Sequence, residues 1–103
     1  METLGQIGPV ADKIRTSSRP AVYALYRLIF EKEGDRTSRR QLRGFRGFDF
    51  NDASDEYGGK LEYAAVFSIG DLTSMCNILG LDYTGSKEEL RQRIIRALMN
   101  IGT

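Results

Sequence analysis

The sequence has no histidine, a single cysteine and no long hydrophobic run. Without histidine, and with Cys76 as its one thiol, the chain lacks the usual zinc sites and the usual general-base and Cys–His chemistry. One cysteine also rules out an internal disulfide and is typical of a reducing compartment. No apolar stretch approaches ~18 residues, and the first residues do not resemble a signal peptide, so we expect no membrane span and no leader.

The sequence also lacks a phosphate-binding P-loop and a dinucleotide fingerprint. A helical chain of 103 residues offers little room for a substrate cleft. We therefore expect no enzymatic activity, no catalytic residues, no metal, no cofactor and no small-molecule substrate.

Signals for β-strands and internal repeats are equally scarce, because no alternating run exceeds about four residues and no Asn-Gly or Asp-Gly turn occurs. Apolar residues instead recur at helical spacing. These patterns predict an all-α fold of about six short helices in one domain, at 7–16, 19–32, 38–45, 54–66, 70–79 and 87–101.

Cap residues mark the expected helix ends. Ser18 precedes the second helix, and Gly34 is expected to end it. Thr37 or Ser38 is expected to begin the third. Gly80, at the end of the fifth helix, is typical of a Schellman motif.

Two features carry chemically suggestive side chains for which a structural role is also open. The three Phe residues of FRGFDF, residues 45–50, could stack on exposed bases, but an aromatic linker between two helical halves more often fills a shared core. Cys76 lies on an apolar helical stripe, which favours a small core residue over a nucleophile.

Charge is unevenly distributed although the net charge is only +1. Residues 12–46 contain ten Lys or Arg and four Asp or Glu, a net charge of +6, whereas residues 47–65 carry −4. A basic block of this kind is a weak indication of nucleic-acid binding, and by itself it favours a solvated helical surface.

The stretch YTGSKEEL, residues 83–90, precedes the last helix. Ser86 and Glu89 form an S-x-x-E capping box, which leaves Gly85 and Lys87 to be explained. A helix N-terminus with a nearby Gly and Lys is a candidate anion site, because its first N–H groups have no intrahelical acceptor. Alternatively, Gly85 provides a positive φ and Lys87 is a solvated surface residue.

The string DLTSMCNILGLDYTGSKEELRQRI, residues 71–94, resembles a SAP motif, with an LGL end to its first helix, a G-x-K element and an E-L-x-x-R-I second helix. SAP motifs are helix–loop–helix DNA-binding elements of chromatin proteins. The resemblance implies that this part of the chain is such an element.

The upstream residues extend the resemblance. A GF-x-GF-x-F segment at 44–50, then Tyr57, a Lys-Leu-Glu stretch and Phe67 follow the order found in the central domain of the DEK family of chromatin proteins. The family implies a divergent, pseudo-SAP half, residues 1–50, packed against a SAP half, residues 51–103, as one compact domain. The Arg-rich segment before the Phe residues and the Gly58-Gly59 pair depart from the family pattern.

The resemblance implies a nuclear module that binds double-stranded or structured DNA by shape, through phosphate contacts, and that contributes to chromatin organisation and DNA topology. Phosphate contacts of this kind give affinity without sequence readout. The first expected contact is formed by Thr84, Gly85, Ser86 and Lys87, with Arg91 one turn further on. The second is formed by Arg39, Arg40, Arg43 and Arg46.

A protein-interaction module is the alternative, with histones or nucleosomes as partners. The acidic segment DFNDASDEYGG, residues 49–59, would then bind a basic tail. The same residues could merely begin a helix.

Overall fold

The computed structural model describes residues 3–101, which contain six α-helices and a short 3₁₀ helix. The elements are η1 (Leu4–Gln6), α1 (Gly8–Thr16), α2 (Arg19–Phe30), α3 (Ser38–Arg43), α4 (Asp55–Ala64), α5 (Ile69–Leu79) and α6 (Lys87–Met99). No strand occurs within that range, and the prediction of an all-α fold is confirmed. None of the helices in residues 3–101 has the length and apolar character to cross a bilayer.

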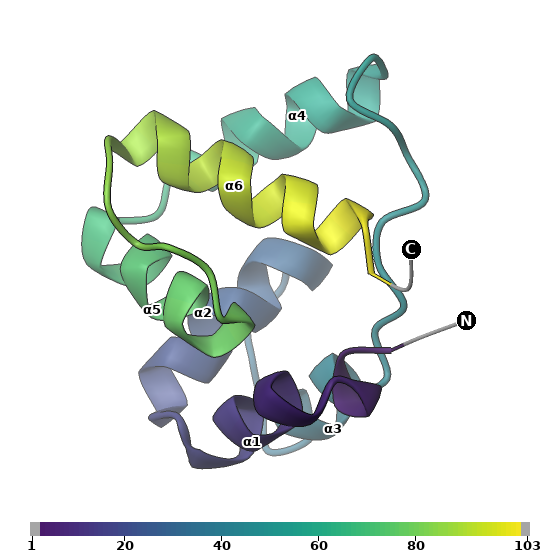
Figure 1. Cartoon of the computed structure of the whole chain (residues 1–103), viewed down its shortest axis with the longest axis vertical. Helices are drawn as coiled ribbons and strands as arrows, with labels where there is room; N and C mark the ends of the chain where they lie inside the picture. Colours follow the sequence, from purple (N-terminus) through teal and green to yellow (C-terminus); the bar gives the residue numbers. More distant parts are fainter. Residues whose placement is uncertain (1–2, 102–103) are drawn as a thin grey trace.

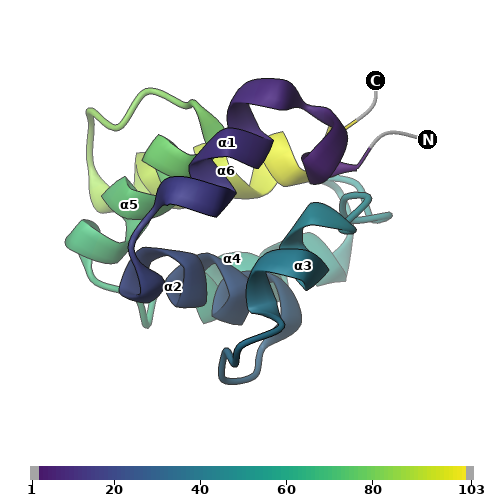
Figure 2. The same cartoon turned by 90° about the horizontal axis from the view of Figure 1, so that it is seen from below.

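The helices form a body of 30 × 30 × 25 Å (Figure 1). α5 contacts α1, α2 and α6, and α6 also contacts α4. Figure 2 shows α1 and α6 on one side of the molecule and α2, α3 and α4 on the other. Because α5 packs on α1 and α2, the segments 1–50 and 51–103 share one core.

The helices bury broad faces. α2 buries six residues, including Ala24 and Leu28. In α6, Ile95 is fully buried together with Leu90, Ile94 and Leu98. A helix with neighbours on two sides needs a broader apolar face than a surface helix does, and α6 lies against both α4 and α5.

Most predicted helix ends are confirmed by hydrogen bonds. The hydroxyls of Ser18 and Ser86 each accept a backbone N–H three residues later, and Ser68 does the same at the start of α5. Gly80 has a φ of 71°, and the Leu81 N–H donates to the Cys76 carbonyl at 2.8 Å, which is the long bond of a Schellman motif. These contacts fix the two ends of the α5–α6 loop.

The end of α2 differs from the prediction of a helix to residue 32 terminated by Gly34. The helix stops at Phe30, and Glu31 takes the left-handed conformation with a φ of 57°. The Lys60 Nζ donates to the Leu28 carbonyl at 2.8 Å and to the Glu31 carboxylate at 2.7 Å, so this turn is held from outside the helix. Gly34 is required for another reason, since a Cβ there would lie 2.6 Å from the Tyr23 ring.

The third helix is also shorter than the predicted 38–45, because it ends at Arg43, and the Phe45 carbonyl accepts the Leu4 N–H at 3.0 Å outside the helix. The N-cap position is Thr37, but its hydroxyl makes no capping bond. Asp35 organises the turn instead, by accepting the Thr37 N–H at 2.8 Å and the Thr37 hydroxyl at 2.6 Å.

The Phe residues of FRGFDF pack against the core, as the core-filling interpretation predicts. Their rings continue a line of contacts that starts on α2, with Phe30 and Phe45 centroids 6.0 Å apart, Phe45 and Phe48 5.3 Å apart, and Phe48 and Phe50 4.9 Å apart. Gly47, with a φ of 103°, lets this segment approach α6, because a Cβ there would lie 2.8 Å from the Leu98 carbonyl oxygen.

Candidate nucleic-acid interface

The α5–α6 loop that precedes Ser86 is held by its own side chains. The Asp82 carboxylate accepts the Thr84 N–H at 2.9 Å and the Thr84 hydroxyl at 2.8 Å. These two bonds lower the pKa of Asp82, the backbone bond having the larger effect. From α6, Arg93 Nη1 donates to the carbonyls of Asp82 and Thr84 at 2.6 and 2.9 Å. The loop is therefore a defined turn.

Gly85 has the positive φ that the structural alternative requires, 115°. A Cβ at this position would also lie 3.1 Å from the Glu89 carboxylate. That carboxylate accepts the Ser86 N–H at 3.2 Å, and the Ser86 hydroxyl accepts the Glu89 N–H at 3.2 Å, so the predicted capping box is confirmed. The bond from the Ser86 N–H lowers the pKa of Glu89. Gly85 is thus explained by the turn, without any ligand.

Lys87 and Arg91 both reach the C-terminal end of α4. Lys87 Nζ donates to the Ala65 carbonyl at 2.9 Å, and Arg91 Nη1 donates to the Leu61 carbonyl at 2.8 Å. Cations stabilise the carbonyl end of a helix because the unpaired C=O groups carry partial negative charge. Lys87 is half-buried and hydrogen-bonded, and is therefore not simply a solvated surface residue.

Arg39 has the same kind of partner at another helix. Its Nη1 donates to the Ile14 carbonyl at 3.2 Å and to the Ser17 carbonyl at 3.3 Å, and Nη2 donates to the Ser17 carbonyl at 3.2 Å. Arg39 therefore holds the C-terminal end of α1 against α3. Lys60 of α4 caps α2 in the same way, and Lys87 of α6 caps α4. Basic side chains from neighbouring elements therefore cap several helices of this fold.

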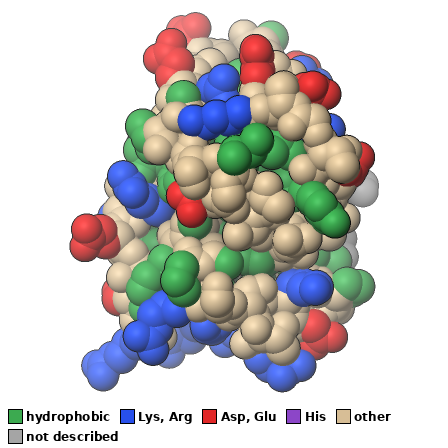
Figure 3. All heavy atoms as spheres, turned by 90° about the vertical axis from the view of Figure 1, so that its left-hand side faces the viewer, with side chains coloured by type: hydrophobic (Ala, Val, Ile, Leu, Met, Phe, Trp, Pro, Cys, Tyr) green, Lys and Arg blue, Asp and Glu red, His purple; other side chains and the backbone are tan. Residues whose placement is uncertain are grey.

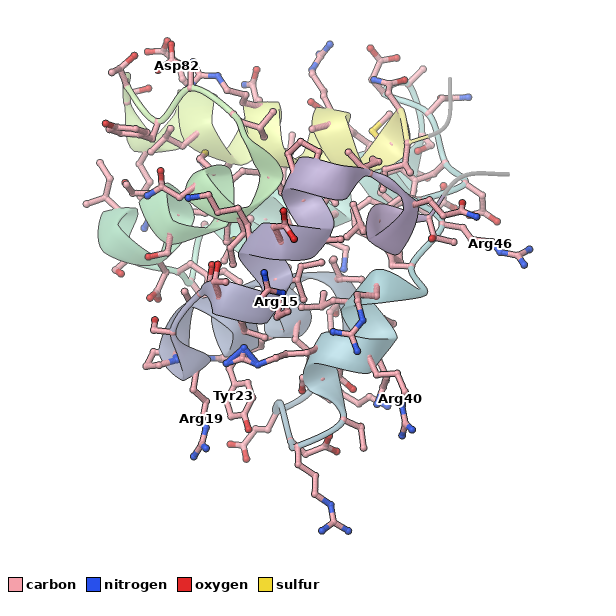
Figure 4. All side chains as sticks on the ribbon, turned by 60° about the horizontal axis from the view of Figure 1, so that its bottom comes forward. Arg15, Arg19, Tyr23, Arg40, Arg46 and Asp82 are labelled. Atoms are coloured by element: carbon pink, nitrogen blue, oxygen red, sulfur yellow. The ribbon has the colours of Figure 1, made fainter. Side chains whose placement is uncertain are left out.

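The other predicted arginines are exposed, and the guanidinium groups of Arg40, Arg43 and Arg46 make no hydrogen bond or ion pair within residues 3–101. Figure 4 shows that Arg46 lies well apart from Arg40. The predicted four-residue cluster is therefore divided between a capping residue, Arg39, an isolated Arg46 and the pair Arg40 and Arg43.

Two further arginines, Arg19 and Arg36, line clefts near that pair, and neither was predicted as a site residue. A cleft of about 450 Å³ is lined by Arg36, Thr37, Arg39, Arg40 and Arg43. A second cleft of about 280 Å³ is lined by Arg19, Tyr23, Asp35, Arg36 and Arg39. We call Arg19, Arg36, Arg40 and Arg43 the arginine face. The spacing of Arg36, Arg40 and Arg43, four and three residues, is the signal that could have revealed it.

The arginine face lies at the end of the molecule where α1, α2 and α3 meet. Figure 3 shows Lys and Arg side chains gathered along the lower edge of the molecule, which is the α1–α3 end in Figure 1. Figure 4 places Asp82, in the loop before α6, at the opposite end from Arg19 and Arg40. The two predicted contacts therefore lie at different ends of the folded molecule.

The remaining candidate residues have simple structural roles. Cys76 is buried in α5, and burial raises the pKa of its thiol. Asp49, Asp52, Asp55 and Glu56 of the acidic segment are exposed, and Asp52 pairs with Arg96 at 3.6 Å. No group of three or more metal-ligating side chains is assembled among residues 3–101.

Comparison with known proteins gives one relationship. Protein DEK from mouse and from human is each 34% identical to this chain over 77 residues, and DEK from rat is 32% identical over the same length. The alignments cover 74% of this chain. This chain is a relative of DEK. The resemblance to the DEK family predicted from the sequence is thereby confirmed. The aligned part covers only 20% of the length of DEK itself.

No protein-family model matches the chain. No solved structure is significantly similar to it.

Proposed function

We propose that this chain is a DNA-binding module of a nuclear chromatin protein, with double-stranded or structured DNA as its partner. The observation that carries the proposal is the arginine face, together with the relationship to DEK. Four exposed guanidinium groups gather on one end of a chain whose net charge is only +1. Enzymatic catalysis is no part of the proposal.

The chemistry of the arginine face suits phosphate rather than base recognition. Guanidinium groups bind phosphate oxygens with charge-assisted, often bidentate hydrogen bonds. Contacts of this kind are independent of sequence, and each neutralised phosphate contributes to the salt dependence of binding. Such a surface would discriminate between DNA molecules by their shape. In this way the module would contribute to chromatin organisation and DNA topology.

The N-terminus of α6 is the second proposed contact, formed by residues 84–87. The N–H groups of Lys87 and Glu88 have no acceptor within residues 3–101, and they lie at the positive end of α6. Glu88 and Glu89 oppose an anion there, and Lys87 would have to leave the Ala65 carbonyl. We therefore expect this contact to contribute less than the arginine face.

The distance between the two proposed contacts is the reason why the module should prefer crossed or bent DNA to a straight duplex. They lie at opposite ends of a body 30 Å long, so one straight duplex would meet only one of them. Crossed or bent duplexes, such as a four-way junction, offer backbone to both ends at once.

The proposal is tested by titrating a straight duplex and a four-way junction at several salt concentrations. Wild-type chain is expected to bind with a log–log salt slope of roughly −4. Arg40→Gln/Arg43→Gln should make the slope about two units shallower, whereas Arg40→Lys/Arg43→Lys, which keeps both charges, should leave it nearly unchanged. A wild-type slope near zero would contradict DNA binding.

A second candidate function is binding of histones by the acidic segment, residues 49–59. It is favoured by the exposure of all four carboxylates, of which Asp52 is the one with an ion pair in the described chain. Neutralising Asp49, Asp52, Asp55 and Glu56 should weaken binding to histones in a pull-down and leave DNA binding intact or stronger. Unchanged histone binding would exclude this surface.

A further inference from the structure

The larger of the two clefts beside α3 has an unusual lining. Arg36, Arg39, Arg40 and Arg43 surround its volume of about 450 Å³, and Thr37 completes it. No carboxylate belongs to that lining in the described chain. The adjoining cleft of about 280 Å³ shares Arg36 and Arg39 but also contains Asp35. The positive charge is therefore concentrated in the larger cleft.

Parts of this cleft are held in place before any ligand arrives. Arg39 is anchored by its three bonds to the carbonyls of Ile14 and Ser17. The Thr37 hydroxyl donates to Asp35 and accepts from Gln41 Nε2 at 2.7 Å. Gln41 Oε1 in turn accepts the hydroxyl of the buried Tyr26 at 3.0 Å. One wall of the cleft is thus tied to the core.

The cleft is open to solvent, and four arginines line one shared volume. A duplex would meet this surface with the phosphates of one strand, whereas a small molecule seated here could present phosphate groups to several of the arginines at once. That volume lies in the range of pockets that hold small molecules. Several guanidinium forks around one cavity match several phosphate groups on one small scaffold.

We propose that the cleft lined by Arg36, Arg39, Arg40 and Arg43 binds a compact small molecule that carries several phosphate monoesters, such as a polyphosphorylated ring. The inference does not need DNA binding to be correct, although it shares Arg36, Arg40 and Arg43 with the arginine face. Where the proposed function also holds, the small molecule competes with DNA for these residues and regulates that contact.

The test is calorimetric titration of the whole chain with inositol hexakisphosphate at about 150 mM salt, where diffuse attraction is screened. One molecule per chain is the expected stoichiometry. Arg40→Gln/Arg43→Gln should weaken binding at least about tenfold, because two of the four forks are lost. The matched control Lys13→Gln/Arg46→Gln removes the same charge from exposed positions outside the cleft and should change binding less than about threefold.

Equal weakening by the two double variants would show diffuse attraction and overturn the inference, as would the absence of binding by wild type. Circular dichroism of each variant identifies any loss of folding, and Arg39 is left unchanged because it caps α1. Arg40→Lys/Arg43→Lys provides a folded second variant, in which loss of affinity at unchanged charge supports recognition by guanidinium forks.

A compact group with several phosphate monoesters could be a free solute or a lipid headgroup. Sedimentation with phosphatidylcholine vesicles that contain phosphatidylinositol bisphosphate separates them. Binding to vesicles that is lost in Arg40→Gln/Arg43→Gln supports a headgroup, and binding to the free hexakisphosphate alone supports a solute. Duplex titrations run in parallel separate this inference from the proposed function, since binding of the hexakisphosphate without DNA binding would sustain the first and contradict the second.

Discussion

At the scale of single residues, two sets of basic side chains differ in what they contact. Arg39, Lys60, Lys87 and Arg91 donate to carbonyls at or near helix ends. The four residues of the arginine face are instead exposed to solvent. Substitutions in the first set remove a helix-end contact and therefore affect folding as well as any binding, whereas substitutions in the second test binding.

Glycines of this chain are expected to respond in opposite ways to alanine. Gly85→Ala should destabilise the chain by about 1–3 kcal/mol, because its φ is 115° and a Cβ would crowd Glu89. Gly59→Ala should stabilise it by about 0.5–1 kcal/mol, because Gly59 lies inside α4 and a Cβ there meets nothing within 4 Å. Urea unfolding of both variants measures the difference. Equal stability of the two would contradict the strain assigned to Gly85.

Acid should destabilise the chain through three carboxylates. Hydrogen bonds from Thr37, Thr84 and Ser86 hold the pKa values of Asp35, Asp82 and Glu89 below their ordinary values. A group whose folded pKa is lowered contributes stability above its unfolded pKa and loses it as pH falls through the folded pKa. The loss should therefore begin below about pH 4.5 and continue on further acidification.

Stability measured between pH 6 and pH 3, by urea unfolding, checks this expectation. Asp82→Asn is the informative variant, because its amide oxygen can still accept the Thr84 bonds but has no proton to gain. Its free energy of unfolding should vary less with pH than that of wild type. If Asp82→Asn and the wild type showed the same pH dependence, Asp82 would not contribute to the acid sensitivity.

At the scale of elements, helix ends depend on contacts from other helices. Lys60 is 8% exposed, and its Nζ donates to the carbonyls of Leu28 and Ile29 and to the Glu31 carboxylate. Its Nζ also lies 5.1 Å from the Phe48 ring centroid and 5.5 Å from that of Tyr63. One residue of α4 thus ends α2 and supports the aromatic segment.

Lys60→Met keeps the aliphatic length and removes the donor. We expect it to destabilise the chain by about 1–3 kcal/mol, because the Leu28 and Ile29 carbonyls lose a buried donor. The Glu31 side chain is 50% exposed, so loss of its ion pair should cost less. Hydrogen exchange should speed up most for the last turn of α2. Lys13→Met, at an exposed position of α1, is the control and should change stability by less than about 0.5 kcal/mol. Similar losses in both variants would contradict the capping role.

At the scale of the whole molecule, the two proposed DNA contacts face different directions. A single chain should then hold two duplexes together, which a chain with one contact cannot do. Co-precipitation of a labelled duplex with an immobilised one, at limiting protein, measures this bridging. Lys87→Gln and Arg40→Gln/Arg43→Gln should each reduce bridging more than they reduce binding to one duplex. Bridging that rises with protein self-association, measured by analytical ultracentrifugation, would contradict bridging by one chain.

The fold was largely predictable because its signals are local. Apolar residues at helical spacing, serines before α2, α4, α5 and α6, and the Gly80-Leu81 pair are recognised within one or two turns, and all correspond to observed elements. The prediction was wrong where a distant residue decides the outcome. Glu31 rather than Gly34 ends α2 because Lys60, about thirty residues away, occupies that turn.

The candidate site was less predictable, because charge in a sequence does not say which groups are already bound. Lys87, Arg91 and Arg39 match an anion-binding pattern, yet each donates to a carbonyl 22 to 30 residues away. Arg36 had only its spacing to Arg40 and Arg43 as a signal, and Arg19 had none. Packing of α2 against α3 places Arg19 at a cleft that Arg36 and Arg39 also line, next to the cleft of Arg40 and Arg43.

The sequence by itself determined the helices, their caps, the aromatic filling of the core and the relationship to DEK, because each depends on residue types at short spacing. Only the tertiary structure decided which basic side chains are consumed as helix caps and which stay exposed. It also decided that the two proposed contacts lie at opposite ends of the molecule. Those outcomes depend on backbone carbonyls and neighbours far along the chain, which no local pattern encodes.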